Sequence, residues 1–195
     1  MRFRRLVGLG RNTVAARWRG RTEAPSVIPA NVAYPAMRFT HLIKALYPEI
    51  MIMIRPSRPD EGTRIIEIWR SAVDATHDFL TPDDRVAIDE MVCGFLPQAP
   101  LWLAVDENDY PLAFMLIDQG HMEALFVDPA RRGTGIGAAL VRHGLTLHPK
   151  MTTDVNEQND QAVRFYERMG FKQTGRSPID GQGRPYPLLH LEYGN

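Results

Sequence analysis

The sequence predicts an α/β (α+β) protein with a mixed, mostly antiparallel central sheet flanked by helices. Its 195 residues, 44% of them apolar, are enough for one globular domain with a substantial core. Strand-like and helix-like segments alternate along the second part of the chain, and the last six follow the order strand, helix, strand, helix, strand, strand. This order favours a sheet that carries helices on its faces.

The first 50 residues differ from the rest in charge. They hold nine Lys or Arg and two Glu, whereas residues 51–195 hold 14 basic and 21 acidic residues. Seven Arg precede Glu23, the first acid, and four prolines follow it. We therefore expect residues 1–50 to be a basic, disordered N-terminal extension and residues 51–195 to form the domain. The alternative is that the first codon is assigned too early and that the natural protein begins at Met51 or Met53.

The domain is expected to begin with a strand at residues 52–55, followed by two helices. Proline and acidic residues favour the first turn of a helix, and they occur together at residues 59–61 and 82–84. Apolar residues recur at helical spacing in the first of these helices, at Ile65, Ile66, Trp69 and Val73.

A hairpin is expected next, at residues 101–118, where two apolar runs flank the turn residues 107–109. Residues 121–128 then predict a strand, residues 134–147 a helix and residues 151–156 another strand.

The chain is expected to close with a helix and a second hairpin. The helix covers residues 160–170 and ends with Gly170, in the position that follows a helix C-cap. The hairpin pairs residues 171–175 with residues 188–193 across a turn-rich segment.

The stretch RRGTGIG at residues 131–137 places three glycines at the start of a helix. Glycine costs conformational entropy, so such a run marks a tight turn or the close approach of a ligand to the main chain. A helix N-terminus with uncovered N–H groups binds phosphate, and the two arginines add positive charge. We expect the segment to bind a pyrophosphate. The expected contacts are Arg131, Arg132, Gly133, Thr134, Gly135, Ile136 and Gly137.

Two other phosphate-binding motifs fit the glycines less well. GTGIGA matches the dinucleotide pattern G-x-G-x-x-A, and Asp154 lies about 20 residues further on, where that motif has its acid. However, residues 128–132 separate the strand from the first glycine, and little chain follows Asp154 to complete such a fold. No Lys-Ser or Lys-Thr pair follows the glycines, which excludes a P-loop.

Two motifs, in order, resemble the GCN5-related N-acetyltransferase (GNAT) superfamily. Residues 132–137 match its acetyl-CoA loop R-x-x-G-x-G, and residues 159–171 match its segment N-x-x-A-x-x-x-Y-x-x-x-G-F. The resemblance covers residues 51–195 and implies the acyl-CoA N-acyltransferase fold, with acetyl-CoA as co-substrate. It also implies direct attack by a primary amine, of a small molecule or of a protein lysine or N-terminus, within a ternary complex.

The resemblance assigns roles to several side chains. Tyr166 occupies the place of the family tyrosine that faces the CoA sulfur, and a phenol can protonate a departing thiolate. Main-chain N–H groups near Phe126 and Val127 are expected to polarise the thioester carbonyl. Asn156 and Asn159 are expected to bond pantetheine.

Glu123 is the leading candidate for the base. An alkylammonium group has a pKa of about 10.4, so the acceptor must lose a proton before it attacks. Strand periodicity predicts that Glu123 shares a face with Leu125 and Val127, as an acid among apolar neighbours. His121 or a water relay is the alternative base.

Residues 74–84 (DATHDFLTPDD) lie between two predicted helices, in the segment that lines the acceptor side in this family. His77 and Phe79 are therefore expected to meet the amine substrate. Cys93 is the one cysteine of the chain and lies in a predicted helix, where we expect a buried apolar residue and no nucleophile.

The composition also limits partners and location. A single cysteine excludes an intramolecular disulfide and favours a reducing compartment, so we expect a cytoplasmic protein. His121-x-Glu123 is too small a cluster to predict a metal site. The sequence has no apolar run of the roughly 18 residues that a membrane span needs. We expect a monomer or a homodimer.

Two alternatives to an enzyme follow from the sequence. One is a non-catalytic acyl-CoA-binding sensor that keeps the glycine loop without turnover. The other is a nucleic-acid-associated protein that uses the basic residues 1–50, although nucleic acid is the less favoured partner.

Overall fold

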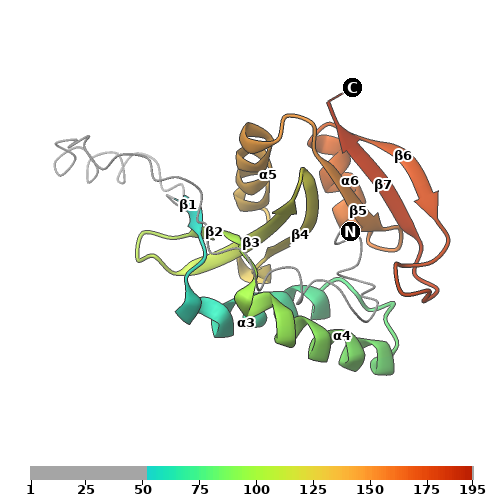
Figure 1. Ribbon diagram of the computed structural model, residues 1–195, viewed down its shortest axis with the longest axis horizontal. Coiled ribbons are helices and arrows are strands. Elements are labelled where there is room, and N and C mark those ends of the chain that lie inside the picture. The colour runs from blue at the N-terminus through green and yellow to red at the C-terminus, as the bar shows by residue number, and fades with distance from the viewer. Residues whose placement is uncertain (1–51, 195) are drawn as a thin grey trace.

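The structure is a computed structural model that describes residues 52–194 (Figure 1). The predicted extension at residues 1–50 lies outside the described residues. In chain order the elements are β1 (Met53–Pro56), η1 (Pro59–Glu61), α3 (Gly62–Asp74), α4 (Pro82–Phe95), η2 (Leu96–Gln98), β2 (Trp102–Val105), β3 (Pro111–Asp118), β4 (His121–Val127), η3 (Pro129–Arg131), α5 (Ile136–Leu147), β5 (Thr152–Asn156), α6 (Asp160–Arg168), β6 (Phe171–Ser177) and β7 (Leu188–Tyr193).

The strands form one sheet of seven, in the order β1-β2-β3-β4-β5-β7-β6. Neighbouring strands run antiparallel except β4 and β5, which are parallel. The predicted mixed, mostly antiparallel sheet flanked by helices is therefore confirmed, together with both hairpins.

The single parallel junction is short. β4 and β5 pair only at His121 with Thr152 and at Met122 with Thr153, although both strands continue beyond these residues. Past Met122 and Thr153 the two strands diverge, and we call this point the fork. The sheet is thus split into a half made of β1 to β4 and a half made of β5, β7 and β6.

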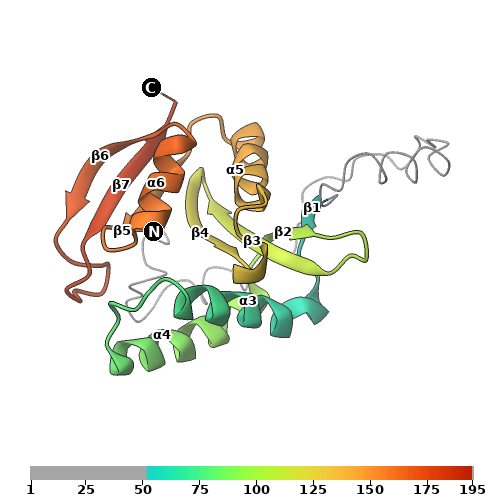
Figure 2. The same cartoon turned by 180° about the vertical axis from the view of Figure 1, so that it is seen from behind.

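The helices α3 and α4 cover one face of the first half (Figures 1 and 2). α3 buries the predicted apolar stripe, and α4 begins at Thr81, whose side chain accepts a hydrogen bond from the Asp84 N–H. Together with the sheet they enclose an apolar cluster, whose largest members are Ile65, Ile68, Trp69, Leu96, Leu101, Leu103 and Phe114.

The helices α5 and α6 lie on the opposite face, against the region of the fork (Figures 1 and 2). Gly144 lets α5 approach the sheet, because a Cβ there would lie 2.9 Å from Ile117 Cδ1 and 3.1 Å from Met151 Sδ. This second cluster includes Met115, Met122, Ile136, Leu140, Val155, Tyr166, Leu189 and Leu191.

The start of α5 and the end of α6 differ slightly from the predicted bounds, because the backbone conformation of a glycine sets each of them. The helix predicted from residue 134 begins at Ile136, because Gly135 is its N-cap and has a left-handed φ of +83°. The last helix ends at Arg168, with Met169 as C-cap, and Gly170 follows it with a φ of +91° in the predicted role.

We predict that a chain beginning at Met51 folds as the full-length protein does. The seven strands and the described members of both apolar clusters lie within residues 52–194, where they form one sheet with helices on both faces. Thermal unfolding followed by circular dichroism should stay cooperative, with an unchanged midpoint. A truncated chain without a cooperative transition would show that the extension belongs to the domain.

Candidate functional site

The glycine segment forms an open loop between β4 and α5. Gly133 and Gly135 have left-handed φ values of +75° and +83°, which glycine adopts without the steric cost that other residues carry. A Cβ at either position would meet no atom within 4 Å. The main chain of both residues therefore faces open space, as a ligand that approaches it closely requires.

The first turn of α5 presents main-chain donors to this space. The amide of Ala139 donates to Gly135 O at 2.9 Å, so the preceding amides of Ile136, Gly137 and Ala138 have no acceptor one turn back in the helix. Gly135, the N-cap, has no side chain with which to cover them. The helix dipole adds partial positive charge at the same end, so the loop suits a phosphate group.

Gly137 has a different role from the other two glycines. A Cβ there would lie 3.4 Å from Val127 Cγ2 and 3.5 Å from Phe165 Cζ. Its missing side chain therefore lets the start of α5 pack closely against the end of β4 and against α6. The prediction that all three glycines leave the backbone bare holds for Gly133 and Gly135, whereas Gly137 is a packing position.

The two arginines beside the loop differ in burial and in hydrogen bonding. Arg131 is exposed, and its carbonyl accepts a hydrogen bond from Thr134 Oγ1 at 2.6 Å. Arg132 is half-buried, and its Nη2 donates to Ala72 O at 3.1 Å, near the end of α3. Burial lowers the pKa of the Arg132 guanidinium. Both guanidinium groups are charged at neutral pH, and the Arg132 side chain also ties the loop to α3.

Glu123 is the extra residue of a β-bulge. Leu116 pairs with Ala124 and Ile117 pairs with Met122, so Glu123 has no residue opposite it on β3. The bulge interrupts the alternation that the sequence predicts, since Ala124 belongs to the α3 cluster and Met122 to the α5 cluster. The prediction that Glu123 shares a face with Leu125 and Val127 assumes unbroken alternation, which the bulge interrupts between Met122 and Ala124.

The Glu123 carboxylate lies next to His121. Glu123 Oε2 is 4.0 Å from His121 Nε2, and the two side chains are 1% and 7% exposed. His121 Nδ1 is 2.8 Å from the Thr152 hydroxyl, across the last paired positions of β4 and β5. Glu123 as a whole residue is half-buried although its side chain is enclosed, so its exposed surface belongs to its main chain. The two candidate bases form one cluster at the fork.

Phe126 and Val127 lie on β4 past the fork. Among the described residues β4 has no pairing with β5 there, so the edge of β4 that faces β5 carries main-chain groups outside the hydrogen bonding of the sheet. The Phe126 ring packs on the Phe114 ring, with centroids 5.4 Å apart, and Val127 packs on the opposite face. The Phe126 side chain thus packs in one apolar cluster and the Val127 side chain in the other. Only the main chain of these residues is left to contact a ligand.

Tyr166 lies beneath the fork. It is 7% exposed, and its hydroxyl hydrogen-bonds with Thr153, whose own hydroxyl donates to Met122 O at 2.9 Å. Burial raises the pKa of the Tyr166 phenol. The group therefore keeps its proton at neutral pH, as a proton donor must.

Asn156 and Asn159 shape the turn between β5 and α6. Asn156 Oδ1 accepts from the Gln158 N–H, and Asn159 Oδ1 accepts from the Ala162 N–H as the N-cap of α6. The amide Nδ2 of Asn156 is buried, and in the part of the chain that the structure describes it has no hydrogen-bond partner. It is a donor left available at the end of β5.

His77 and Phe79 lie in the connection between α3 and α4. Their rings are 5.2 Å apart, and Phe79 is 5.9 Å from the ring of Tyr186, in the β6–β7 connection. The Tyr186 hydroxyl donates to Asp84 Oδ2 in α4 at 2.6 Å and accepts from the Thr81 N–H at 3.1 Å, and this second bond joins the two connections. Burial lowers the pKa of His77 to about 4, so its imidazole is neutral at pH 7.

Comparison with known proteins identifies this arrangement. Residues 83–185 match the model of the acetyltransferase (GNAT) domain. The chain is 59% identical over 144 residues to the peptidyl-lysine N-acetyltransferase YjaB of Salmonella typhimurium, across 74% of this chain and 99% of that protein. The chain belongs to the GNAT acetyltransferase family. It is therefore an acetyl-CoA-dependent N-acetyltransferase, and the resemblance seen in the two motifs is confirmed.

Two solved structures share this fold. The apo form of YjaB from Escherichia coli matches with a TM-score of 0.72 and 54% identity, over 74% of this chain and 98% of that one. The PaiA N-acetyltransferase of Thermoplasma acidophilum, solved in complex with coenzyme A, matches with a TM-score of 0.62 at 16% identity, over 75% of this chain and all of that one (100%). The second likeness supports the fold alone.

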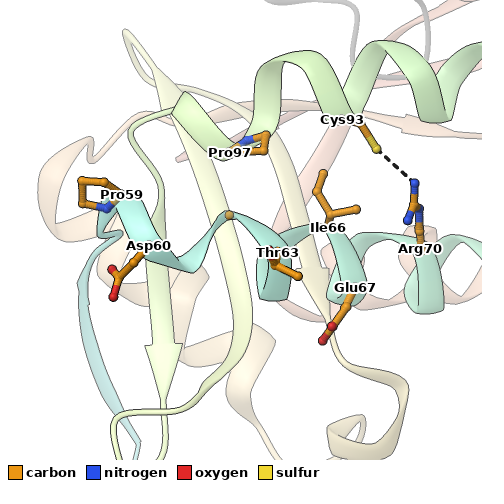
Figure 3. Close-up of a pocket in the computed structure, with 9 residues that line it drawn as sticks. Pro59, Asp60, Thr63, Ile66, Glu67, Arg70, Cys93 and Pro97 are labelled. Carbon is orange, nitrogen blue, oxygen red and sulfur yellow. Dashed lines mark hydrogen bonds between the residues drawn. The ribbon is translucent and has the colours of Figure 1, made fainter.

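A groove of about 490 Å³ between α3 and α4 is separate from the GNAT site (Figure 3). Its lining comes from η1, α3, α4 and η2, without a residue of the fork or of the glycine loop. Cys93 lines it and is half-buried, with Sγ 3.2 Å from Arg70 Nη2 and 3.4 Å from Asp89 Oδ2. Cys93 is thus half-buried where the sequence predicts a buried apolar residue, and it packs against the α3–α4 cluster. Burial raises the pKa of this thiol, which disfavours a nucleophilic role.

Residues 52–194 lack two further features. Within these residues, no group of three or more His, Cys, Asp or Glu is placed to hold a metal ion. Within the same range, none of the helices is long and apolar enough to span a bilayer.

We predict that Gly135→Asp abolishes binding of acetyl-CoA in a folded protein. The substitution puts a carboxylate where the loop presents its donors, and like charges repel. Isothermal titration calorimetry with acetyl-CoA measures the loss. Gly135→Asn has the same size and backbone strain without the charge, and should bind more tightly than the Asp variant.

Gly183→Asp is the matched control. Gly183 has a φ of +84° and open space around it, like Gly135, but lies in the β6–β7 connection. It should bind acetyl-CoA as the parent protein does. Unchanged affinity in folded Gly135→Asp would refute the assignment of the loop.

Proposed function

We propose that this acetyltransferase modifies lysine side chains of proteins in the cytoplasm. The observation that carries the proposal is the 59% identity to a peptidyl-lysine N-acetyltransferase along nearly its whole length. A lysine side chain is a long, flexible primary amine, which can reach an acetyl group held at the fork while the rest of the acceptor stays at the surface.

The glycine loop binds the pyrophosphate of acetyl-CoA, and the fork binds its thioester end. The amides at the start of α5 and the exposed Arg131 hold the pyrophosphate, next to Gly133 and Gly135. The unpaired main chain of β4 near Phe126 and Val127 supplies N–H donors to the thioester carbonyl, where negative charge develops as the amine attacks. The buried Nδ2 of Asn156 donates to an amide carbonyl of pantetheine.

The cluster of Glu123 and His121 removes the proton of the acceptor. Its two side chains lie on β4 at the start of the fork, so a proton taken from the amine has an acceptor close to the acetyl site. Attack by the neutral amine on the thioester then forms the amide and releases the thiolate, and no acyl-enzyme is needed on this route.

Tyr166 protonates the departing thiolate. Its raised phenol pKa keeps it protonated, and its position next to Thr153 places it at the fork. His77 and Phe79 lie on the acceptor side, where the neutral imidazole and the aromatic ring contact the incoming chain. Residues 51–195 suffice for this chemistry, either as a monomer or as a homodimer.

We predict that the full-length protein releases CoA when it is mixed with acetyl-CoA and lysine-containing peptides. Thiol release is measured with a chromogenic disulfide, and mass spectrometry locates the acetyl group on the peptide. Peptides in which lysine is replaced by arginine are the control. A guanidinium group stays protonated near neutral pH, so it offers no neutral amine that could attack the thioester. Transfer to small amines alone, with every peptide left unmodified, would contradict a protein substrate.

We predict that Tyr166→Phe lowers turnover by about 10²- to 10⁴-fold, the usual contribution of a positioned general acid. The loss should fall on kcat, because the proton is needed as the C–S bond breaks, while affinity for acetyl-CoA stays near that of the parent. Tyr193→Phe is the matched control, since Tyr193 also packs on Phe171 but lies on β7.

Equal activity of Tyr166→Phe and the parent would remove Tyr166 from the mechanism. A parent protein that binds acetyl-CoA but transfers nothing to any amine would instead support a sensor.

A further inference from the structure

A second set of reactive side chains lies on the other half of the sheet. His190 Nδ1 is 2.6 Å from Asp154 Oδ1, and His190 Nε2 is 2.8 Å from Ser177 Oγ. The three residues come from β5, β7 and β6, which are adjacent in that order. We call them the Asp154–His190–Ser177 array. None of the roles proposed above uses it.

The strand register holds the histidine between its two partners. Asp154 pairs directly with His190 across β5 and β7. On the other side His190 pairs with Gly175, and a Cβ on Gly175 would lie only 3.1 Å from His190 Cδ2. The missing side chain at Gly175 therefore leaves room for the imidazole to reach Ser177, two residues further along the same face of β6.

A bulge in β6 adds a further restraint. Gln173 pairs with Leu191 and Gly175 with His190, so Thr174 is the extra residue. The Thr174 hydroxyl donates to the carbonyl of His190 at 3.2 Å. Both the side chain and the main chain of His190 are thus held by neighbouring strands.

The two contacts suit one tautomer of the imidazole. With the proton on Nδ1, Asp154 accepts it and the lone pair is on Nε2. Ser177 then donates its hydroxyl proton to Nε2. A hydroxyl that donates to an imidazole oriented by a carboxylate is the arrangement in which serine becomes a nucleophile.

The array is open to solutes. His190 and Asp154 have side chains that are 27% and 14% exposed, and Ser177 is half-buried. Leu189 and Leu191 belong to the α5–α6 cluster, so strand alternation turns His190 to the opposite face. The cluster under α3 and α4 takes no residue from β5, β6 or β7 within residues 52–194, so this core does not cover the array.

We propose that Ser177 is an activated nucleophile that takes up acyl groups from activated esters and passes them to water. The bond from Ser177 Oγ to the acyl carbon forms as the bond to the leaving oxygen breaks. The Ser177 proton passes to His190 Nε2 and then to the leaving alcohol, while Asp154 stabilises the imidazolium. Water then adds to the acyl carbon and gives a proton to His190, which returns it to Ser177 Oγ as the carboxylic acid leaves. This activity needs neither CoA nor an amine.

The test uses the full-length protein with p-nitrophenyl acetate and with a fluorophosphonate. We expect a burst of p-nitrophenol equal to the enzyme concentration, and mass spectrometry should place the acetyl or phosphonyl group on Ser177. His190→Gln should slow acylation by about 10²- to 10⁴-fold, the contribution of a positioned base. Asp154→Asn should also slow it, because the amide lacks the charge that stabilises the imidazolium.

Ser177→Ala should abolish the burst and the label, with its folding checked by circular dichroism. Ser71→Ala is the matched control and should keep both, because the Ser71 hydroxyl donates to Ile68 O on α3. The proposal is overturned if the folded parent leaves Ser177 unmodified, or if His190→Gln is modified as fast as the parent. Neither result bears on transfer of acetyl groups to lysine, since that assay measures an acetylated peptide.

Discussion

The early end of pairing between β4 and β5 is the constraint on which the site depends. Continuous pairing would use the main-chain donors of both strands within the sheet and would leave none for a ligand. Because pairing ends at Met122 and Thr153, β4 keeps an unpaired edge near Phe126 and Val127. The same divergence brings Glu123, His121 and Tyr166 to the point where the strands separate.

A divergence of this kind weakens a sheet unless other elements hold the strands. Here the two apolar clusters do so from opposite faces, with α3 and α4 under the first half and α5 and α6 across the fork. Close packing at Gly137 ties α5 to the end of β4 and to α6, and the Arg132 side chain ties the glycine loop to the end of α3. The glycine loop is therefore fixed to both cores.

Both polar clusters of the sheet lie beside a β-bulge. Glu123 is the extra residue of one, and Thr174, which bonds the His190 carbonyl, is the extra residue of the other. A bulge breaks the alternation of faces and so changes which way the side chains next to it point. Acetyl transfer at the fork and acyl transfer at Ser177 would thus use the same structural device on two halves of one sheet.

The sequence by itself determined most of the helices and strands. It also determined those features of the site that depend only on residues close together in the chain. The two hairpins and the end of the last helix before Gly170 follow from local rules of turn chemistry and periodicity. The two GNAT motifs are identified by their resemblance to the family. The tertiary structure alone decided the fork, the bulge at Glu123, the separate role of Gly137 and the array at His190. His190 lies 36 residues from Asp154 and 13 from Ser177 in the chain, and only strand pairing brings them together. A one-residue shift in register turns a strand's side chains to the other face, and no local pattern records where such a shift occurs.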